Sequence, residues 1–467
     1  MIEYQPSSLV RPASKRATLI IASITAFITP FMGSSINIAL PAIEKALDAD
    51  AVLLSWVATA YLLAVAISLA PSGRMADIYG RKKIFTLGVL VFTVFSLLSG
   101  FSETVFVLIL LRVFQGIGGA MIFSTSIAIL TSVFPPQERG RALGINVAAV
   151  YTGLSLGPFL GGLLTQYLTW RSVFWVHVPL CLVVILLVFW KLKGEWAEAE
   201  GERFDVAGTL VYAVSIIAVS LSLLSALRGF WLPVFGLGIV GMILFVKMEL
   251  RIKHPVFDLR LFSTNRLFAF SSLAALINYS ATFAVTFLLS LYLQQVRGLD
   301  PKAAGLILVA QPAMMVLCSP FAGRLSDRVE PRIVASTGMA VTTLSLVIFI
   351  FLGEQSNFLS IIVNLAFLGV GLGLFSSPNT NAIMGSVERR FYGLASGSVG
   401  TMRSLGMMIS MCITALIFSR FLGRVQIAPE HFSAFMKSFR LAFVVFSLLC
   451  LGGVFSSLIR GSLREKL

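Results

Sequence analysis

Two arginines, Arg112 and Arg403, are the only ionisable side chains that lie deep within long apolar runs of this 467-residue chain. At the centre of a membrane an arginine costs about 2.5–3.5 kcal/mol even on the mildest scale, and such residues usually face a cavity. We therefore expect each arginine either to contact a substrate or coupling ion, or to organise the helices around it. Gln115 lies three residues beyond Arg112, on the same face of a helix, and is a candidate partner for it.

Acidic residues are absent from the apolar runs. All 21 Asp and Glu residues fall in tails, connections or the ends of runs. A carboxylate inside a membrane is a natural carrier of a coupled proton and a natural partner for a cationic substrate. Its absence favours a neutral or anionic substrate, with any proton carried by peripheral groups. His177, near the end of a run, can titrate near neutral pH, but a lone histidine there more often forms a simple hydrogen bond.

Polar residues within the runs are candidates to line a central cavity. Asn37 in the first run belongs to this group, as do Asn278 and Tyr279 in the ninth. Met32 and its aromatic neighbours can accommodate a bulky lipophilic ligand, although helix packing accounts for each of them equally well. The four cysteines have no metal-ligand spacing. We expect no metal site, no cofactor and no enzyme activity.

The elements that position these residues are membrane helices. Hydrophobic residues make up 57% of the chain, charged residues only 12%, and the mean hydropathy is +0.92, whereas an ordinary soluble domain carries about 25% charged residues. The net charge of +15 does not indicate nucleic-acid binding, because no basic segment is long enough to read a groove. It is typical instead of membrane proteins, which concentrate Lys and Arg in cytoplasmic loops.

A bilayer core of about 30 Å needs roughly 20 residues of helix. This length predicts fourteen spans, near 17–41, 52–72, 83–101, 104–126, 141–166, 172–192, 206–227, 231–250, 268–293, 302–322, 332–353, 357–378, 393–420 and 437–460. Most of the 36 Lys and Arg residues fall in the two tails and in the connections after even-numbered spans. That asymmetry predicts a multi-pass protein of the cell (cytoplasmic) membrane with both termini in the cytoplasm.

The chain also repeats itself. The segment 73–77 (GRMAD) recurs 250 residues later as 323–327 (GRLSD), and Glu138-Arg139 recurs at the same offset as Glu388-Arg389. The repeat predicts two six-helix units, 1–192 and 268–467, with two inserted helices and their flanking loops in 193–267. Internal repeats around a site near the membrane midplane are typical of secondary transporters.

Four segments resemble the motifs of one family in both order and spacing. They are the end of the first span (37–41, NIALP), the connection after the second (73–83), part of the fourth (112–119) and part of the fifth (153–162). Together they resemble the major facilitator superfamily. They are most similar to its fourteen-span drug:proton antiporter branch, which includes multidrug, quaternary-ammonium and tetracycline exporters.

The resemblance implies an all-α major facilitator fold with two six-helix bundles and two inserted helices. It also implies alternating-access export of lipophilic small molecules, with the proton as counter-ion and membrane lipid as surroundings. Met32 stands where related exporters usually have an aspartate. The resemblance gives a conformational role to Gly73, Asp77, Arg81, Gly323 and Asp327. It assigns Gly153, Gly157, Pro158 and Gly161 to the antiporter motif.

The residues themselves support part of this assignment. Gly153, Gly157 and Gly161 are four residues apart, so they form one small-residue face for close helix contact. Pro158 removes a backbone hydrogen bond and favours a kink.

Two alternative functions stay open. One is a facilitator or uptake carrier for a neutral or anionic organic solute without proton coupling; the other is a non-transporting membrane sensor or enzyme, disfavoured because every connection is short. This architecture can work as a monomer.

Overall fold

The computed structural model describes residues 14–224, 231–252, 255–257, 259–387, 392–423 and 425–461, and within these ranges every regular element is helical. In lipid, each backbone N–H and C=O must be satisfied within its own segment, so long apolar runs fold as helices. Side-chain caps fix where several of them begin. The Asp50 carboxylate accepts from the Leu53 N–H at 2.7 Å, and the Asp300 carboxylate accepts from the Ala303 N–H at 2.7 Å.

The helices of the first half and of the insertion are α1 (Lys15–Leu47), α2 (Ala51–Tyr79), α3 (Arg81–Ser99), α4 (Val105–Val133), α5 (Pro136–Tyr167), α6 (Ser172–Trp175), α7 (His177–Lys191), α8 (Val206–Leu224) and α9 (Trp231–Glu249). The remainder are α10 (Arg260–Thr264), α11 (Arg266–Thr282), α12 (Ala284–Leu291), the π-helix η1 (Tyr292–Val296), α13 (Pro301–Leu308), α14 (Ala310–Arg328), α15 (Pro331–Ile350), α16 (Phe358–Gly385), α17 (Tyr392–Phe421), the short η3 (Pro429–His431) and α18 (Phe432–Ile459).

The predicted span count is confirmed closely. In the described part of the chain, thirteen helical segments are long and apolar enough to cross a membrane, and Val206–Ser222 is a shorter apolar helix that corresponds to the remaining predicted span. Several helices are longer than predicted. At about 1.5 Å per residue, the 33 residues of α1 exceed a bilayer core of about 30 Å. Part of α1 therefore projects beyond the hydrocarbon.

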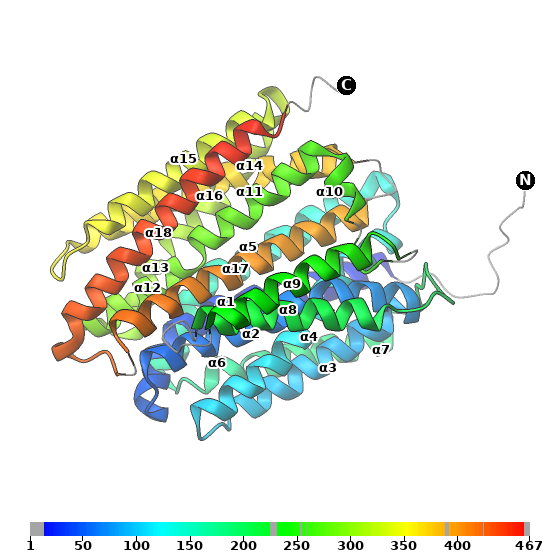
Figure 1. Cartoon of the computed structure of the whole chain (residues 1–467). Helices are drawn as coiled ribbons and strands as arrows, with labels where there is room; N and C mark the ends of the chain where they lie inside the picture. The colour runs from blue at the N-terminus through cyan, green and yellow to red at the C-terminus, as the bar shows by residue number, and fades with distance from the viewer. Residues whose placement is uncertain are drawn as a thin grey trace, which may run out of the picture.

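The helices form two bundles, as the fold class predicted. We call α1–α7 the first bundle and α11–α18 the second bundle. In the first, α1 packs on α5 and α4 packs on α2 and α3; in the second, α16 packs on α14 and α15, and α11 packs on α17 and α18. The bundles meet where α2 contacts α17 and where α5 contacts α13 (Figure 1).

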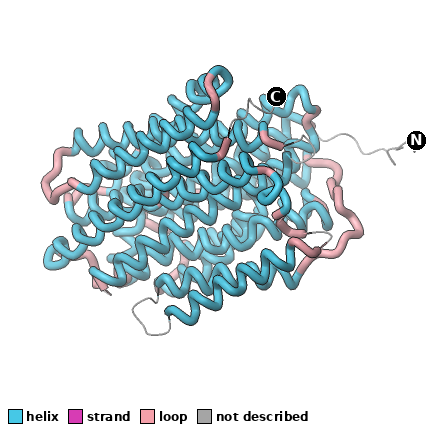
Figure 2. Tube along the Cα trace, turned by 45° about the horizontal axis from the view of Figure 1, so that its top comes forward, coloured by secondary structure: helices cyan, strands magenta, loops and turns pink. Residues whose placement is uncertain are grey.

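The molecule has two ends, which we call the terminal end and the distal end. The terminal end holds the start of α1 and the end of α18, which lie at the same side of the molecule (Figure 1). The distal end holds the connections α1–α2 and α17–α18. Figure 2 shows that the long helices run between these two ends and that the longer loops lie at them.

The inserted pair, α8 and α9, lies along the line where the two bundles meet. The Tyr212 hydroxyl on α8 donates to the Ala66 carbonyl on α2 at 3.1 Å. The Ser220 hydroxyl on the same helix lies 3.5 Å from the Met408 sulfur on α17. Helix α9 packs on α8, where Gly238 lies against Val219. The inserted pair thus contacts both bundles through α8.

Candidate functional site

Side chains from both bundles meet near the middle of the molecule. The Tyr151 hydroxyl on α5 lies 3.2 Å from the Ser376 hydroxyl on α16. The same tyrosine interacts electrostatically with Tyr279 on α11 and Arg403 on α17. The Arg403 guanidinium carbon lies 4.6 Å from the centroid of the Phe123 ring on α4. We call these five residues the central cluster.

Arg403 has hydrogen-bonding capacity to spare. Its side chain is half-buried, and its Nε is a buried donor with no hydrogen-bond partner among the described residues. A buried unpaired donor costs about 1–3 kcal/mol, whereas the contact with Phe123 stabilises the guanidinium only by about 0.5–2 kcal/mol. An acceptor supplied by a ligand would satisfy this nitrogen. Because Phe123 stacks on Arg403 and Tyr151 interacts with it, the cluster combines one cation with aromatic surface.

Arg112 lies in a different place, inside the first bundle. Its Nε donates to the Val57 carbonyl at 3.1 Å, and its Nη1 bonds to the Gln115 side-chain oxygen. Gln115 in turn donates to the Ser96 hydroxyl at 2.6 Å. The guanidinium stacks on the Tyr61 ring at 4.2 Å and is 1% exposed. Of the two roles predicted for Arg112, these contacts support the structural one.

His177 lies beside this network and is also fully buried. Its Nδ1 lies 2.8 Å from the Val173 carbonyl, and its ring lies 5.1 Å from that of Phe31 and 6.2 Å from that of Phe92. A carbonyl can only accept, so Nδ1 is the donor here. His177 therefore forms a simple hydrogen bond, the more frequent of the two roles given for it in the sequence analysis.

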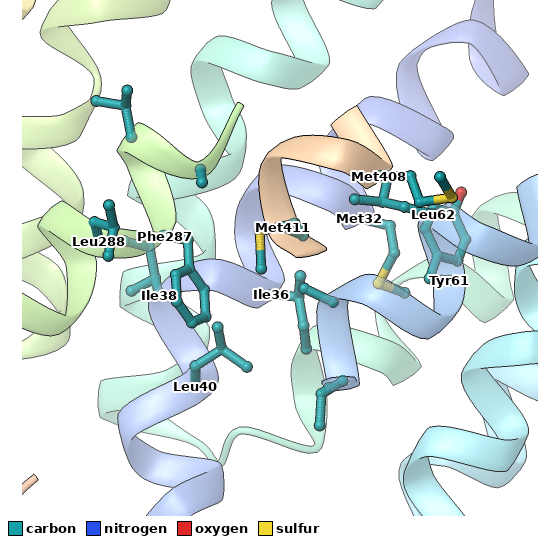
Figure 3. Close-up of a cluster of buried hydrophobic side chains, with 14 of the residues drawn as sticks. Met32, Ile36, Ile38, Leu40, Tyr61, Leu62, Phe287, Leu288, Met408 and Met411 are labelled. Atoms are coloured by element: carbon teal, nitrogen blue, oxygen red, sulfur yellow. The ribbon is translucent and has the colours of Figure 1, made fainter. Parts of the chain in front are cut away.

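Met32 and Asn37 belong to the interface between the bundles. Met32 lies beside Tyr61 and Leu62 of α2 and near Met408 of α17, and it is 0% exposed (Figure 3). The Asn37 carbonyl accepts from the Ser290 hydroxyl of α12 at 2.6 Å, while its side-chain oxygen has no hydrogen-bond partner among the described residues. The first bundle thus contributes both residues to a shared, largely apolar contact.

Asn278 directly precedes Tyr279 of the central cluster in the sequence, but it is a buried residue of α11. It is 1% exposed, and neither side-chain atom has a hydrogen-bond partner among the described residues. Its neighbour Tyr279 is half-buried and packs its Cβ against Gly406 of α17. The structure therefore places Tyr279 and Arg403 on two packed helices, where both interact with Tyr151, and places Arg112 and Gln115 in a separate network.

The glycines of the predicted antiporter motif form a packing face. A Cβ at Gly153 would collide with the Phe27 carbonyl of α1, one at Gly157 with the Ser34 hydroxyl, and one at Gly161 would lie 2.8 Å from Ser35 Cα. All three face α1 inside the first bundle. Pro158 lies within α5.

The next positions of α5 face the second bundle. A Cβ at Gly162 would collide with the Pro301 carbonyl of α13, and one at Gly305 of α13 would collide with the Pro158 carbonyl. Helix α5 therefore approaches α13 as closely as backbone atoms allow. This contact exists only while α5 and α13 are packed together. A change of conformation that separates the two bundles here would therefore break it.

The conformational motif packs on the connection that leads to the inserted pair. Arg81 donates from Nε to the Asp77 carboxylate at 2.9 Å, and from Nη1 to the Glu198 carboxylate at 2.8 Å. Arg74 pairs with Glu202. Gly73 has ordinary contact with Ser124, so close packing does not require a glycine there.

In the repeat of this motif, Gly323 lies against the Ser377 hydroxyl, where an added Cβ would be 3.0 Å away. The Asp327 side chain and the Glu388-Arg389 pair lie outside the described residues.

The distal end is closed by hydrogen bonds between the bundles. Gln294 Nε2 donates to the Ile38 carbonyl at 3.0 Å, and the Ala51 N–H donates to the Val425 carbonyl at 3.2 Å. The Lys302 N–H donates to the Gln166 side chain at 3.2 Å. Next to these bonds lies the apolar contact drawn in Figure 3. It includes Met32, Ile36, Ile38, Leu40, Phe287, Leu288, Met408 and Met411.

Comparison with known proteins agrees with this architecture. The family model described as "Major Facilitator Superfamily" matches residues 22–277 and again residues 271–466, which together include nearly the whole chain. The chain belongs to the major facilitator superfamily.

Several curated relatives of this superfamily member are transporters. It is 30% identical over 445 residues to the riboflavin transporter RibZ of Clostridioides difficile, covering 94% of this chain and 96% of the relative. It is 30% identical to the multidrug resistance protein Stp of Mycobacterium tuberculosis, covering 87% and 76%. It is 28% identical to the tetracenomycin C resistance and export protein of Streptomyces glaucescens, covering 87% and 77%. The chain is therefore a multi-pass membrane transporter and not an enzyme.

Solved structures share the fold. A peptide transporter POT in complex with sulfate matches with a TM-score of 0.66 at 14% identity, covering 93% of this chain and 94% of that one. A bacterial homologue of the lysosomal transporter Spinster matches with a TM-score of 0.65 at 16% identity, covering 96% of each.

Sequence reasoning missed two features of this site. It did not single out Tyr151 or connect it with Ser376, because the contact depends on how two distant helices meet. It treated Glu44 only as a residue at the end of a span. A signal was present: Asn37 and Glu44 are seven residues apart on one helix face, and both contact the second bundle.

Proposed function

We propose that this protein is a secondary active exporter of lipophilic small molecules, driven by proton antiport, with a preference for neutral or anionic compounds. The single observation that carries the proposal is Arg403 in the central cluster, with its unpaired Nε beside aromatic side chains. Relatives named as a multidrug resistance protein and as an export protein support the direction and the substrate class.

Transport by alternating access follows from the two bundles. We take 1–192 and 268–467 as the units that move and the central cluster as the site that they share. The asymmetry of Lys and Arg supports a cell (inner) membrane protein with both termini in the cytoplasm. The distal end then faces outward, and the structure corresponds to a state closed on that side. Each chain acts as a monomer.

A carrier without proton coupling is the second candidate. The relative named as a riboflavin transporter is matched over 94% of this chain, and no carboxylate lies in the central cluster. Such a carrier would move a neutral or anionic organic solute down its own gradient. Indifference of transport to an imposed pH gradient distinguishes it from the exporter.

The test compares substrate charge in proteoliposomes. Lipophiles of similar size that are neutral, anionic or cationic are supplied to the wild-type protein and to Arg403→Gln. The proposal predicts a several-fold loss of anion transport in the variant and a smaller change for neutral compounds. Arg420→Gln is the matched control. Arg420 is exposed in the last turn of the same helix, α17, so this variant should retain wild-type transport. Equal transport of all compounds by Arg403→Gln and the wild-type protein would contradict the proposal.

A further inference from the structure

Glu44 joins the first bundle to two separate segments of the second. It lies in the last turns of α1, and its side chain is 2% exposed. Its Oε2 accepts from Gln295 Nε2 of η1 at 2.7 Å, and its Oε1 accepts from the Ile427 N–H in the α17–α18 connection at 3.0 Å. Both partners belong to the second bundle. When the distal end opens, the carboxyl group loses both and faces water.

The π-helix η1 presents Gln295 to this site. Along the same turn, Gln294 donates to the Ile38 carbonyl at 3.0 Å and to the Ser290 hydroxyl at 3.0 Å. The two adjacent glutamines thus hold α1 at two levels. π-helical turns occur frequently at functional sites, and this one is part of the Tyr292-Leu293-Gln294-Gln295 segment, to which the transport cycle proposed above gives no role.

Burial opposes the ionisation of Glu44 when the distal end is closed, whereas of the nearby charges Lys45 favours the charged form more than Asp50 opposes it. Asp50 acts on it electrostatically from the start of α2, and Lys45 is the nearby cation on its own helix. Asp48 lies in the connection between these helices and accepts from Gln426 at 2.5 Å. Burial without a fully charged partner favours the neutral form of a carboxyl group, and like charges nearby act in the same direction.

The other charged groups described near Glu44 have other contacts or face solvent. Arg297, after η1, donates to the Ser356 carbonyl at 2.5 Å and stacks on the Phe358 ring at 4.4 Å. Glu430 and His431 of η3 are exposed and half-buried respectively. Arg424 lies outside the described residues. Lys302 of α13 contacts the Tyr167 hydroxyl at 3.4 Å.

A neutral Glu44 fits the closed geometry without an unsatisfied group. Its carbonyl oxygen accepts from the Ile427 N–H, and its hydroxyl donates to the side-chain oxygen of Gln295 once that amide is turned by 180°. An ionised Glu44 keeps both hydrogen bonds shown but buries a charge, which is the more costly state. Closure of the distal end and protonation of Glu44 therefore favour each other.

We call the contact of Glu44 with Gln295 and Ile427 the distal gate. We propose that the Glu44 carboxyl group is the proton-binding site of this gate, and that it takes up a proton from the distal side as this end closes. The proposal rests on the alternating access of the proposed function. It gives the transporter a proton-dependent step although the central cluster has no carboxylate. Water at the open distal end supplies the proton, and the same group releases it when the end reopens.

The test measures the distal end directly. Spin labels are attached at Leu168→Cys and Glu354→Cys, exposed positions of the first and second bundle at that end, in a background where half-buried Cys318 is replaced by Ser. Distances are measured by double electron–electron resonance between about pH 8 and about pH 5, a range that brackets the titration of perturbed carboxyl groups. We expect the short-distance, closed population of the unmodified gate to rise several-fold as the pH falls.

Three variants separate the gate from its surroundings. Glu44→Gln mimics the protonated group, so we expect a closed population that does not change with pH. Gln295→Leu removes a partner but keeps the carboxyl group, so we expect less closure with the pH response retained. Glu430→Gln, an exposed carboxylate on the neighbouring η3, is the matched control and behaves as the unmodified gate.

Two outcomes distinguish this inference from the proposed function. If the unmodified protein transports lipophiles but its distal distances do not depend on pH, or if Glu44→Gln keeps the full pH response, the inference is wrong and the exporter stands. If the distances depend on pH through Glu44 while no lipophile is transported, the gate stands and the exporter is wrong.

Discussion

The hydroxyl groups of Tyr151 and Ser376 lie 3.2 Å apart and join α5 of the first bundle to α16 of the second. The other hydrogen bonds between the bundles that are described above lie at the distal end. The Tyr151–Ser376 pair instead lies beside Arg403, where we place the substrate. A ligand that enters the central cluster therefore competes for polar groups that hold the bundles together.

Tyr151→Phe tests this relationship. Loss of the hydroxyl removes one hydrogen bond, for which a net change of about 0.5–1.5 kcal/mol is expected. We predict a several-fold change in the apparent KM of a transported lipophile, with little change in the amount of folded protein. Tyr212→Phe, which removes the bond of α8 to Ala66, is the matched control. Its KM should equal that of the wild-type protein; an equal change in both variants would argue against the central cluster.

Arg112 is predicted to stabilise the fold of the first bundle. Arg112→Ala would leave the buried Gln115 side-chain oxygen without its donor, at a cost of about 1–3 kcal/mol, and would remove the bond between α4 and the Val57 carbonyl of α2. We expect a clear fall in the melting temperature of the detergent-solubilised protein. Arg403→Ala should lower it much less. If Arg112→Ala melted like the wild type but lost substrate binding, the structural role would be wrong.

The contact between α5 and α13 gives a prediction about conformation. Gly162→Val places a side chain against the Pro301 carbonyl, so the bundles cannot close fully at this level. We expect a shift towards an open distal end, visible as longer distances between labels at Leu168 and Glu354. Gly144→Val is the control on the same helix, because nothing lies within 4 Å of a Cβ there. Unchanged distances in Gly162→Val would show that the contact does not limit closure.

Met32 offers a test of substrate charge. Met32→Asp introduces a carboxylate beside Tyr61 (Figure 3), whose ring carries the Arg112 guanidinium at 4.2 Å. A carboxylate there can attract a cationic ligand. We predict that the variant transports monovalent cationic dyes that the parent does not, measured by dye efflux from cells. Met32→Asn has similar polarity without the charge and should not. Strong export of dications by the parent would contradict the account.

Much of the fold could be predicted from the sequence, because hydropathy and length decide where helices cross a bilayer. The 250-residue repeat and the spacing of Gly153, Gly157 and Gly161 likewise predicted the two bundles and one packing face, and the structure shows both. The partner of that face is α1, which spacing alone does not reveal. Helix ends were less accurate, since helices such as α16 continue past the apolar run to Gly385.

The site was harder to predict because it depends on which faces of distant helices meet. Arg112 and Arg403 look alike in sequence, yet one is bonded inside a bundle and the other has an unpaired nitrogen between bundles. Glu44 was passed over because depth in the membrane was the criterion, and a carboxylate at a helix end fails it. Its importance comes from Gln295 and Ile427, which are distant in sequence.

Proton flux in everted membrane vesicles tests the central claim, proton-coupled export, most directly. A pH-sensitive dye reports the gradient, and neutral, anionic and cationic lipophiles are added once it is established, with vesicles from empty-vector cells as control. The account predicts that neutral and anionic lipophiles collapse the gradient only in vesicles that contain the protein. Uptake of a labelled lipophile without any collapse would contradict proton antiport and favour the uncoupled carrier.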